Sequence, residues 1–265
     1  MPFLTIFTAP KPFTNPHIAI IQRNAIQSWK QLGKDVSVLL LGDEPGLAEA
    51  AHTLGVRHLP GLKRSPQGTP LVSHIFELAR LHSDSPLMVF ANADMLLMPD
   101  LVKSAIEVID QSSRFLVVGQ RWDLDVKQPL SFGPGWDESL RRDVRKRGRL
   151  HAAGGSDYFI YPRDCFADLP EFAIGRAGWD NWMIYHARAH QWDVIDATPS
   201  IMAVHQDHDY SHLPGGQSHY NLEESDRNRL LAGGKSHMYI LLDANKRLVE
   251  GRLRRPPRSL SRLLR

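Results

Sequence analysis

The stretch Pro86-Leu87-Met88-Val89-Phe90-Ala91-Asn92-Ala93-Asp94 carries the strongest fold signal in this sequence. Its first six residues are apolar without a break, which is typical of a strand that is covered on both faces. Asn92 and Asp94 follow at once, so the strand ends beside a carboxylate. A carboxylate at the mouth of a buried strand is costly unless a cation meets it. The stretch therefore predicts a buried sheet strand with a polar site at its carboxyl end.

Outward from this strand, strand and helix patterns alternate over the first 120 residues. The other strands are expected at Pro2–Thr8, Val36–Leu41, Val56–Leu59 and Phe115–Gly119. Asn15-Pro16 and Thr69-Pro70 each predict a helix that starts with a capping residue followed by proline. Further helices are expected at Pro45–Leu54 and Asp100–Asp110. The alternation predicts an α/β fold with a Rossmann-like, mostly parallel sheet flanked by helices.

The second half of the chain is less regular. Helices are expected at Asp137–Arg147, Asp180–His190 and Asn221–Ala232. Short strands are expected at Tyr158–Tyr161, Val194–Ala197 and Ile201–Val204. Because no repeat and no linker interrupts these elements, we expect one domain over residues 1–250 with two unequal halves that meet near residue 120.

Composition narrows the class of protein. Of 265 residues, 42% are hydrophobic and 23% are charged, as in an ordinary globular protein. The single cysteine, Cys165, excludes an internal disulfide and a zinc site built from thiolates. The first residues lack the pattern of a secretory signal, and no stretch approaches the roughly 20 apolar residues of a spanning helix. We therefore expect a cytoplasmic protein.

The net charge of +3 is distributed unevenly. Residues 251–265 contain six arginines and no acidic residue, and without them 26 basic residues stand against 29 acidic ones. This basic tail has the charge to meet phosphates or an anionic membrane, which would place the protein at the inner membrane surface. We favour a solvated, partly disordered end. With an acidic body, no nucleic-acid partner is expected.

Asn92-Ala93-Asp94 is the first motif with chemical meaning. A hard cation such as Mg²⁺ or Mn²⁺ binds few carboxylates and fills its other positions with water and phosphate oxygens. The same spacing occurs at Asp123-Leu124-Asp125 and Asp207-His208-Asp209, but only Asn92–Asp94 ends a fully apolar strand. An aspartate that only caps the turn after the strand is the alternative.

Two further motifs lie in the second half. Gly154-Gly155-Ser156-Asp157 precedes a strand, and paired glycines allow a ligand to approach the backbone closely, although by themselves they favour a tight turn. Gly178-Trp179-Asp180-Asn181-Trp182 places a carboxylate between tryptophans, as in sugar sites. Asp180 as a helix cap is the alternative, and core packing explains at least one indole, Trp182.

A histidine cluster follows the last short strand. The segment His205-Gln206-Asp207-His208-Asp209-Tyr210-Ser211-His212 holds three histidines and two acids in eight residues. Neutral imidazole is a good ligand for transition metals. His205, where the strand ends, is the best candidate for a ligand, and the others are candidates for contacts to phosphate or acceptor. A structural histidine is the alternative.

Taken together, these motifs resemble those of GT-A-fold glycosyltransferases, in a small bacterial-type branch of the nucleotide-diphospho-sugar transferases. Asn92-Ala93-Asp94 resembles the DxD motif of that family, and Gly154-Gly155-Ser156 resembles its glycine-rich loop. Gly178–Trp182 is similar to the acidic motif at a helix start, and His205 to a late histidine that completes the metal site. The similarity covers about residues 3–212.

The resemblance implies a role for each residue. Asp94 and His205 would hold Mn²⁺ or Mg²⁺, and Asp180 would be the catalytic base, with Asp157 as its substitute. Asn92 stands where the first Asp of DxD is usual, and it would contact ribose or sugar. Asp180-Asn181 stands where many relatives carry two acids, which leaves Asp180 as the only carboxylate there. Together with Asn92, the residues expected around the nucleotide sugar are Thr8, Lys11, Asp43, Arg64, Gly154 and Gly155.

The resemblance predicts a glycosyltransferase with a nucleotide-sugar donor, for which UDP is one carrier. Residues 1–120 would form the nucleotide half and 121–250 the acceptor half. A glycan, a lipid-linked molecule or a small molecule would be the acceptor. A sugar nucleotidyltransferase needs a glycine-rich loop after the first strand, but Thr8–Phe13 contains no glycine. A non-catalytic nucleotide- or sugar-binding protein is the other alternative, and the absence of HExxH argues against a histidine-based metallohydrolase.

Overall fold

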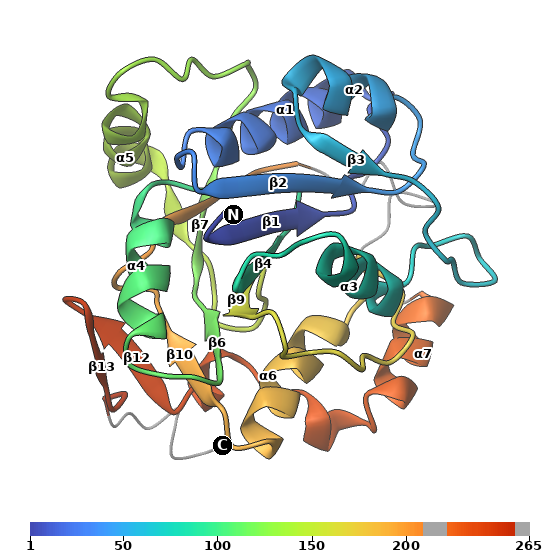
Figure 1. Cartoon of the computed structure of the whole chain (residues 1–265), viewed down its shortest axis with the longest axis vertical. Helices are drawn as coiled ribbons and strands as arrows, with labels where there is room; N and C mark the ends of the chain where they lie inside the picture. The colour runs from blue at the N-terminus through green and yellow to red at the C-terminus, as the bar shows by residue number, and fades with distance from the viewer. Residues whose placement is uncertain (209–221, 258–265) are drawn as a thin grey trace.

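A computed structural model describes residues 1–208 and 222–257 of the chain. Within these residues the central sheet has nine strands in the order β13-β12-β10-β6-β9-β4-β1-β2-β3 (Figure 1). The strands are β1 (Leu4–Thr8), β2 (Val36–Leu41), β3 (Arg57–Leu59), β4 (Leu87–Ala91), β6 (Phe115–Val118), β9 (Tyr158–Pro162), β10 (Asp193–Asp196), β12 (Lys246–Val249) and β13 (Arg252–Arg254). The apolar run at Pro86–Ala91 thus forms a central strand, as its composition predicts.

Most neighbouring strands of this sheet run parallel. Strand β1 pairs in parallel with β2 and β4, and β10 does so with β6 and β12. Strand β9 is the exception inside the sheet, because it runs antiparallel to both β4 and β6. Its reversed direction sets Tyr158, its first residue, opposite Ala91, the last residue of β4. The predicted mostly parallel sheet is confirmed, and the reversal places Asp157 next to Asn92.

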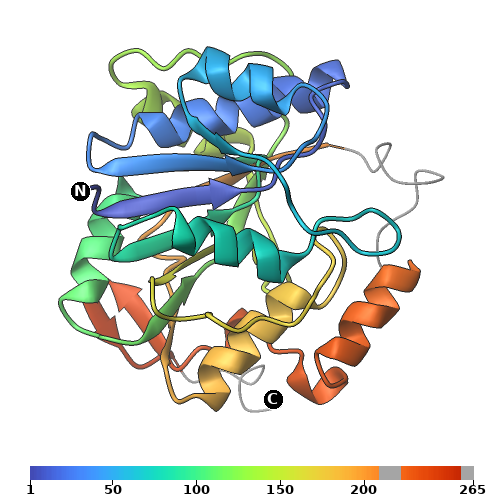
Figure 2. The same ribbon diagram turned by 45° about the vertical axis from the view of Figure 1, so that its right-hand side comes forward.

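Helices cover both faces of the sheet (Figure 2). They are α1 (Pro16–Lys30), α2 (Leu47–Leu54), α3 (Val72–Leu81), α4 (Asp100–Ile109), α5 (Trp136–Arg147), α6 (Trp179–Ala189) and α7 (Glu223–Leu231). Residues of α1, α2 and α4 pack against one face of the sheet, and residues of α3 and α6 pack against the other. Both figures show α1 and α2 on the opposite side of β1 and β2 from α3 and α6.

The two predicted helix starts differ in outcome. The side chain of Asn15 accepts hydrogen bonds from the backbone nitrogens of His17 and Ile18, with Pro16 as the first helical residue, as predicted. The start predicted at Thr69 is wrong, because α3 begins at Val72. The hydroxyl of Thr69 instead donates to a carboxylate oxygen of Glu224, 155 residues away in sequence, so a tertiary contact replaces the local cap.

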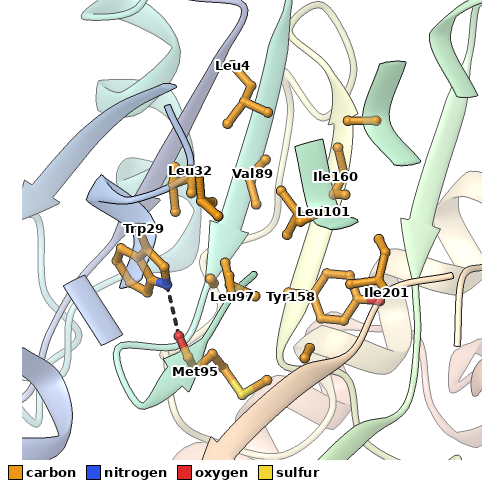
Figure 3. Packing of buried hydrophobic residues seen from close by; sticks show 14 of the residues in the cluster. Leu4, Trp29, Leu32, Val89, Met95, Leu97, Leu101, Tyr158, Ile160 and Ile201 are labelled. Atoms are coloured by element: carbon orange, nitrogen blue, oxygen red, sulfur yellow. Dashed lines mark hydrogen bonds between the residues drawn. The ribbon is translucent and has the colours of Figure 1, made fainter. Parts of the chain in front are cut away.

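Trp29 fixes the chain immediately after the polar end of β4. This fully buried indole packs in the core between α1 and the sheet, and its Nε1 donates to the backbone oxygen of Met95 at 2.8 Å (Figure 3). Met95 follows Asp94 directly, so the rigid core sets the position of that carboxylate. A buried aromatic anchor of this kind holds a functional loop at low cost in side-chain entropy.

A second, smaller sheet lies beside the main one. It consists of β5 (Met95–Leu96), β11 (Ala203–Gln206), β7 (Arg121–Leu124) and β8 (Arg149–Leu150), in that spatial order. Strand β11 begins two residues later than the strand expected at Ile201–Val204, so His205 lies within the strand rather than after it. An apolar cluster that includes Leu140 and Val144 of α5 covers this sheet.

The C-terminal part of the described chain is a hairpin on the edge of the main sheet. Strand β12 pairs in parallel with β10, and β13 turns back antiparallel to β12 through Gly251, whose φ is +75°. The basic tail, which its charge sets apart from residue 251 onward, therefore starts inside a hairpin. Residues 258–265 lie outside the described part of the chain. No described helix has the length and apolar character needed to cross a membrane.

A buried carboxylate attaches α7 to two loops of the domain. Glu224, 5% exposed, accepts hydrogen bonds from the hydroxyls of Ser65 and Thr69 and from Nε of Arg176 at 2.8 Å. Burial by itself raises the pKa of Glu224, but these hydrogen bonds and the Arg176 charge outweigh it, and the net direction is downward. The ionised carboxylate therefore stabilises the fold at pH values above the usual pKa of glutamate, and this stabilisation is lost as the pH falls through the lowered pKa.

We expect Glu224→Ala to lower the free energy of unfolding by about 3 kcal/mol, because it leaves the Arg176 guanidinium, whose side chain is only 15% exposed, without its carboxylate partner. The melting temperature should fall by roughly 6–12 °C. Glu223→Ala, a neighbouring exposed glutamate, is the control and should stay within about 0.5 kcal/mol of wild type in urea unfolding. Equal midpoints for the two variants would contradict the role assigned to Glu224.

Candidate active site

The register of the small sheet brings three distant segments together. His205 pairs with Met95 on one side and with Asp123 on the other. The backbone nitrogen of Gln206 also donates to the backbone oxygen of Asp94 at 3.1 Å. Asp94, Asp123 and His205 therefore meet at one place, although they are separated by up to 111 positions in the printed sequence.

Asp94 is the centre of this group. Its Oδ2 lies 3.1 Å from Nε2 of His208, 3.7 Å from Nζ of Lys11 and 4.0 Å from Nε2 of His205. Its Oδ1 is buried and has no hydrogen-bond partner in the described chain. Burial raises the pKa of Asp94, but the hydrogen bond from His208 and the charges of His205 and Lys11 outweigh it and hold the pKa far below its usual range. Asp94 is therefore an ionised carboxylate at neutral pH.

The other ring nitrogen of His205 faces two more carboxylates. Its Nδ1 lies 3.5 Å from Oδ1 of Asp207 and 3.6 Å from Oδ1 of Asp123. Burial lowers the pKa of His205, while the nearby carboxylates of Asp207 and Asp94 raise it, and the net direction is upward. The imidazole thus bridges two groups that each have three metal-ligating side chains, Asp94–His205–His208 and Asp123–His205–Asp207.

The first of these groups fits a divalent cation better. Among the residues that the structure describes, Oδ1 of Asp94 has no hydrogen-bond partner, whereas both oxygens of Asp123 are already engaged by Arg121, Arg149 and His151. Two imidazoles and one carboxylate form a mixed nitrogen and oxygen donor set, which suits a transition metal better than Mg²⁺, a cation that prefers oxygen alone. Among the described residues, Asp94, His205 and His208 are the set that we assign to a cation.

Asn92 and Asp157 form a second polar pair at the end of β4. The backbone nitrogen of Asn92 donates to the backbone oxygen of Asp157, and the Asn92 amide donates to Oδ1 of Asp157 at 2.8 Å. Oδ2 of Asp157 accepts a hydrogen bond from the guanidinium of Arg121. Because both carboxylate oxygens have partners, Asp157 is poorly suited to remove a proton from a substrate.

Asp180 has the environment of a base. It lies in the first turn of α6, whose cap is Gly178, so the alternative that Asp180 itself caps the helix is wrong. Its Oδ2 accepts a long hydrogen bond of 3.4 Å from the backbone nitrogen of Ser156. Burial raises the pKa of Asp180 to about 6, although backbone hydrogen bonds from Asn181 and Ser156 act in the opposite direction. A carboxylate with such a pKa is ionised at pH 7 and still accepts a proton readily.

The residues around Asp180 have a structural explanation in part. Both tryptophans of the motif are buried, Trp179 at 5% and Trp182 at 8% exposure, so the core takes both indoles and the sugar-stacking interpretation is wrong for them. Asn181 donates to the backbone oxygens of Gly154 and Tyr239, which connects the glycine loop to α6. A Cβ at Gly154 or Gly155 would meet nothing within 4 Å, so the space beside the loop is open.

The remaining predicted residues lie at the carboxyl ends of β1 to β3. Thr8 is buried at the end of β1, and Lys11 reaches Nε2 of His208 at 3.1 Å. The exposed Asp43 accepts from the backbone nitrogen of Gly61 at 2.8 Å. Arg64 donates to Glu44 and to the backbone oxygen of Gly68, both at 2.8 Å. Of these four, the structure brings only Lys11 into contact with Asp94 and its histidines.

Sequence reasoning missed several members of the site. No fully apolar strand precedes Asp123, so the sequence does not predict a site there, yet strand pairing brings Asp123 to His205. Arg121 carried no signal at all, and His208 was only one of several histidines in a dense segment. Asp209, Tyr210, Ser211 and His212, the rest of that segment, lie outside the described residues. The spacing His205-Gln206-Asp207-His208 is the one local signal that pointed to His208.

Comparisons with known proteins give structural matches only. No protein-family model matches the sequence, and no curated protein is significantly similar to it. The chain is similar to the crystal structure of glucosyl-3-phosphoglycerate synthase from Mycobacterium tuberculosis in complex with Mg²⁺ and UDP. The identity is 14%, the coverage is 89% of this chain and 78% of that one, and the TM-score is 0.52.

The complex of the same enzyme with Mn²⁺, UDP and glucosyl-3-phosphoglycerate matches over 97% of this chain and 87% of that chain. The identity is again 14% and the TM-score is 0.53. The protein has the GT-A fold. The resemblance inferred from four short motifs is thereby confirmed at the level of fold. In this GT-A domain Asp94 and its two histidine neighbours lie where β4, one of the central strands, ends.

Proposed function

We propose that this GT-A protein is a metal-dependent glycosyltransferase that moves a sugar from a nucleotide-diphosphate donor to a hydroxyl acceptor. The observation that carries the proposal is the convergence of Asp94, His205 and His208 at the carboxyl end of β4. Ligands of open α/β sheets bind at this edge. The structurally similar synthase was crystallised with Mn²⁺ or Mg²⁺ and UDP, which supports the same class of ligand here.

The charges of the site suit a pyrophosphate. A bound cation would neutralise the negative charge that develops on the leaving nucleoside diphosphate. Asp94, His205 and His208 would hold that cation, and Nζ of Lys11 is close enough to the group to meet a phosphate oxygen. Asn92 would contact ribose or sugar through its amide oxygen, because its amide nitrogen is engaged with Asp157. Thr8, Asp43 and Arg64 would border the nucleotide at the ends of the neighbouring strands.

Asp180 would act on the acceptor. Its carboxylate would take the proton of an acceptor hydroxyl as the oxygen attacks the anomeric carbon of the donor. The open space beside Gly154 and Gly155 lies on the same side of α6, since Ser156 and Asn181 connect the loop to the helix start. Asp157, which we considered as a substitute base, would instead hold Asn92 and Arg121 in place.

A ligand screen tests the proposal. We expect the melting temperature to rise by several degrees when one nucleoside diphosphate, such as UDP or GDP, is added together with Mn²⁺. A ligand at a hundred times its Kd stabilises by about 2.7 kcal/mol. The same nucleotide without metal should give a much smaller shift. Shifts that are equal with and without Mn²⁺, or absent for every nucleotide, would overturn the proposal. A second measurement distinguishes an enzyme from a binding protein: an enzyme should slowly hydrolyse the matching nucleotide sugar and release the sugar, and a binding protein should not.

A further inference from the structure

The imidazole of His205 has different surroundings on its two nitrogens. On the Nδ1 side, carboxylate oxygens of Asp207 and Asp123 lie at 3.5 and 3.6 Å. On the Nε2 side, the nearest carboxylate oxygen belongs to Asp94, at 4.0 Å. A carboxylate attracts an N–H group and repels a ring lone pair, so two near carboxylates favour the hydrogen on Nδ1. The lone pair of Nε2 then points toward Asp94.

Asp123 is unusually well anchored for this task. Its side chain is 3% exposed, and its Oδ1 accepts from Nε of Arg121 at 3.0 Å. Its Oδ2 contacts a guanidinium nitrogen of Arg149 at 3.0 Å and Nδ1 of His151 at 2.8 Å. These partners come from β7, from β8 and from the residue after β8, so the small sheet itself holds the carboxylate. A group held in this way keeps a fixed direction toward its neighbour.

The same contacts argue against a second metal ion between Asp123, His205 and Asp207. Every oxygen of Asp123 already faces a donor, and a cation there would lie beside the guanidinium groups of Arg121 and Arg149. Asp94, by contrast, keeps a buried oxygen without a partner in the described chain. Asp123 and Asp207 are thus better explained as carboxylates that fix the ring orientation of a metal-binding histidine, His205, than as the ligands of a metal ion.

We infer that Asp123, assisted by Asp207, is a positioning residue that holds His205 as the Nδ1–H tautomer and aims its Nε2 at the cation bound by Asp94 and His208. The inference rests on the proposed function for the presence of that cation. Asp123 itself does not touch the cation or the donor. Outer carboxylates of this kind typically change metal affinity by 10- to 100-fold when they are removed.

The test compares Asp123→Asn with Asp125→Asn in the full chain. Asp125 lies two residues further along, is exposed and pairs only with Lys127 among the ion pairs of the described residues, so it is a matched control. Mn²⁺ binding is measured by electron paramagnetic resonance, with the metal alone as probe. We expect one Mn²⁺ per chain in all proteins, an affinity lowered by about 10- to 100-fold in Asp123→Asn, and no change in Asp125→Asn.

A second readout does not need metal. Nitrogen-15 NMR of labelled histidine, with the His205 signals assigned by comparison with His205→Gln, reports which ring nitrogen carries hydrogen. We expect wild-type His205 to show a protonated Nδ1 and an unprotonated, lone-pair Nε2 at alkaline pH, and Asp123→Asn to populate the other tautomer. Asp207→Asn, at a half-exposed position, keeps the test available if Asp123→Asn does not fold, and it should shift the tautomers in the same direction.

The outcomes separate this inference from the proposed function. If the affinity for Mn²⁺ and the tautomer both remain as in wild type when Asp123 is replaced, the orienting role is overturned while the metal site stands. Two Mn²⁺ ions per chain would also overturn it, because Asp123 would then be a ligand. If instead Asp94→Asn leaves Mn²⁺ binding intact, the metal assignment fails, and the metal-free tautomer measurement still decides the role of Asp123.

Discussion

Replacing Asp94 by asparagine is expected to lower kcat/KM for the donor by at least about 10³-fold, or roughly 4 kcal/mol of transition-state stabilisation. Asp94 supplies the only carboxylate of the assigned ligand set, and its Oδ1, which has no hydrogen-bond partner within residues 1–208 and 222–257, is the atom best placed to meet a cation. The neutral amide keeps the shape of the side chain but removes the charge. Both the Mn²⁺-dependent thermal shift with nucleotide and the turnover of the donor should therefore disappear.

The control for this experiment is Asp84→Asn. Asp84 is exposed and precedes β4, whereas Asp94 follows it, so the two changes remove the same charge from opposite ends of one strand. Asp84→Asn should retain wild-type activity, and circular dichroism should show that both variants are folded. Metal-dependent turnover at the wild-type rate in Asp94→Asn would refute the metal assignment, and with it the catalytic proposal built on that site.

Asp180→Asn is expected to lower kcat by about 10²- to 10⁴-fold, the range by which a positioned general base accelerates a reaction. Because Asp180 would act on the acceptor, the affinity for nucleotide with Mn²⁺ should remain within about twofold of wild type. A kcat effect without a change in donor affinity distinguishes a base from a residue that only shapes the pocket. Asp157→Asn provides the comparison, and a larger loss of kcat there than in Asp180→Asn would assign the base to Asp157.

The pH dependence gives an independent measure of the same role. Burial raises the pKa of Asp180 from 3.8 to about 6, so this carboxylate becomes protonated as the pH falls through that value. A base must be ionised to accept a proton, and kcat should therefore fall by about tenfold for each pH unit below 6 and reach a plateau above it. The acidic limb should be absent from the residual activity of Asp180→Asn. A wild-type profile that stays flat down to pH 4.5 would contradict this assignment.

The sequence alone predicts the parts of this molecule whose signals are local. The largely apolar run Val36–Leu41 forms β2 with those same bounds, because a strand that helices cover on both faces is rich in apolar residues. Asn15 caps α1 as predicted, since the capping bond joins residues that are two and three positions apart. Asp94 was identified by the same kind of signal, a charge that directly follows an apolar strand. These inferences need no knowledge of distant contacts.

The tertiary structure decides whatever depends on pairing between distant segments. Thr69 looks like a helix cap but donates to Glu224, because α7 packs against its loop. Nothing in Tyr158–Pro162 indicates that β9 runs against its neighbours, yet that direction brings Asp157 to Asn92. Both outcomes depend on contacts between segments that are far apart in the sequence, and short-range residue patterns do not predict such contacts.

The candidate site shows the same division most clearly. Polar residues beside apolar runs are visible one segment at a time, so the fold class, the carboxylate at the end of β4 and the histidine-rich segment can be predicted from the sequence. The contact of His208 with Asp94 and the position of Asp123 beside Nδ1 of His205 become apparent only in the folded chain. Both depend on the register of β5, β11 and β7, which is set by hydrogen bonds between strands far apart in the chain.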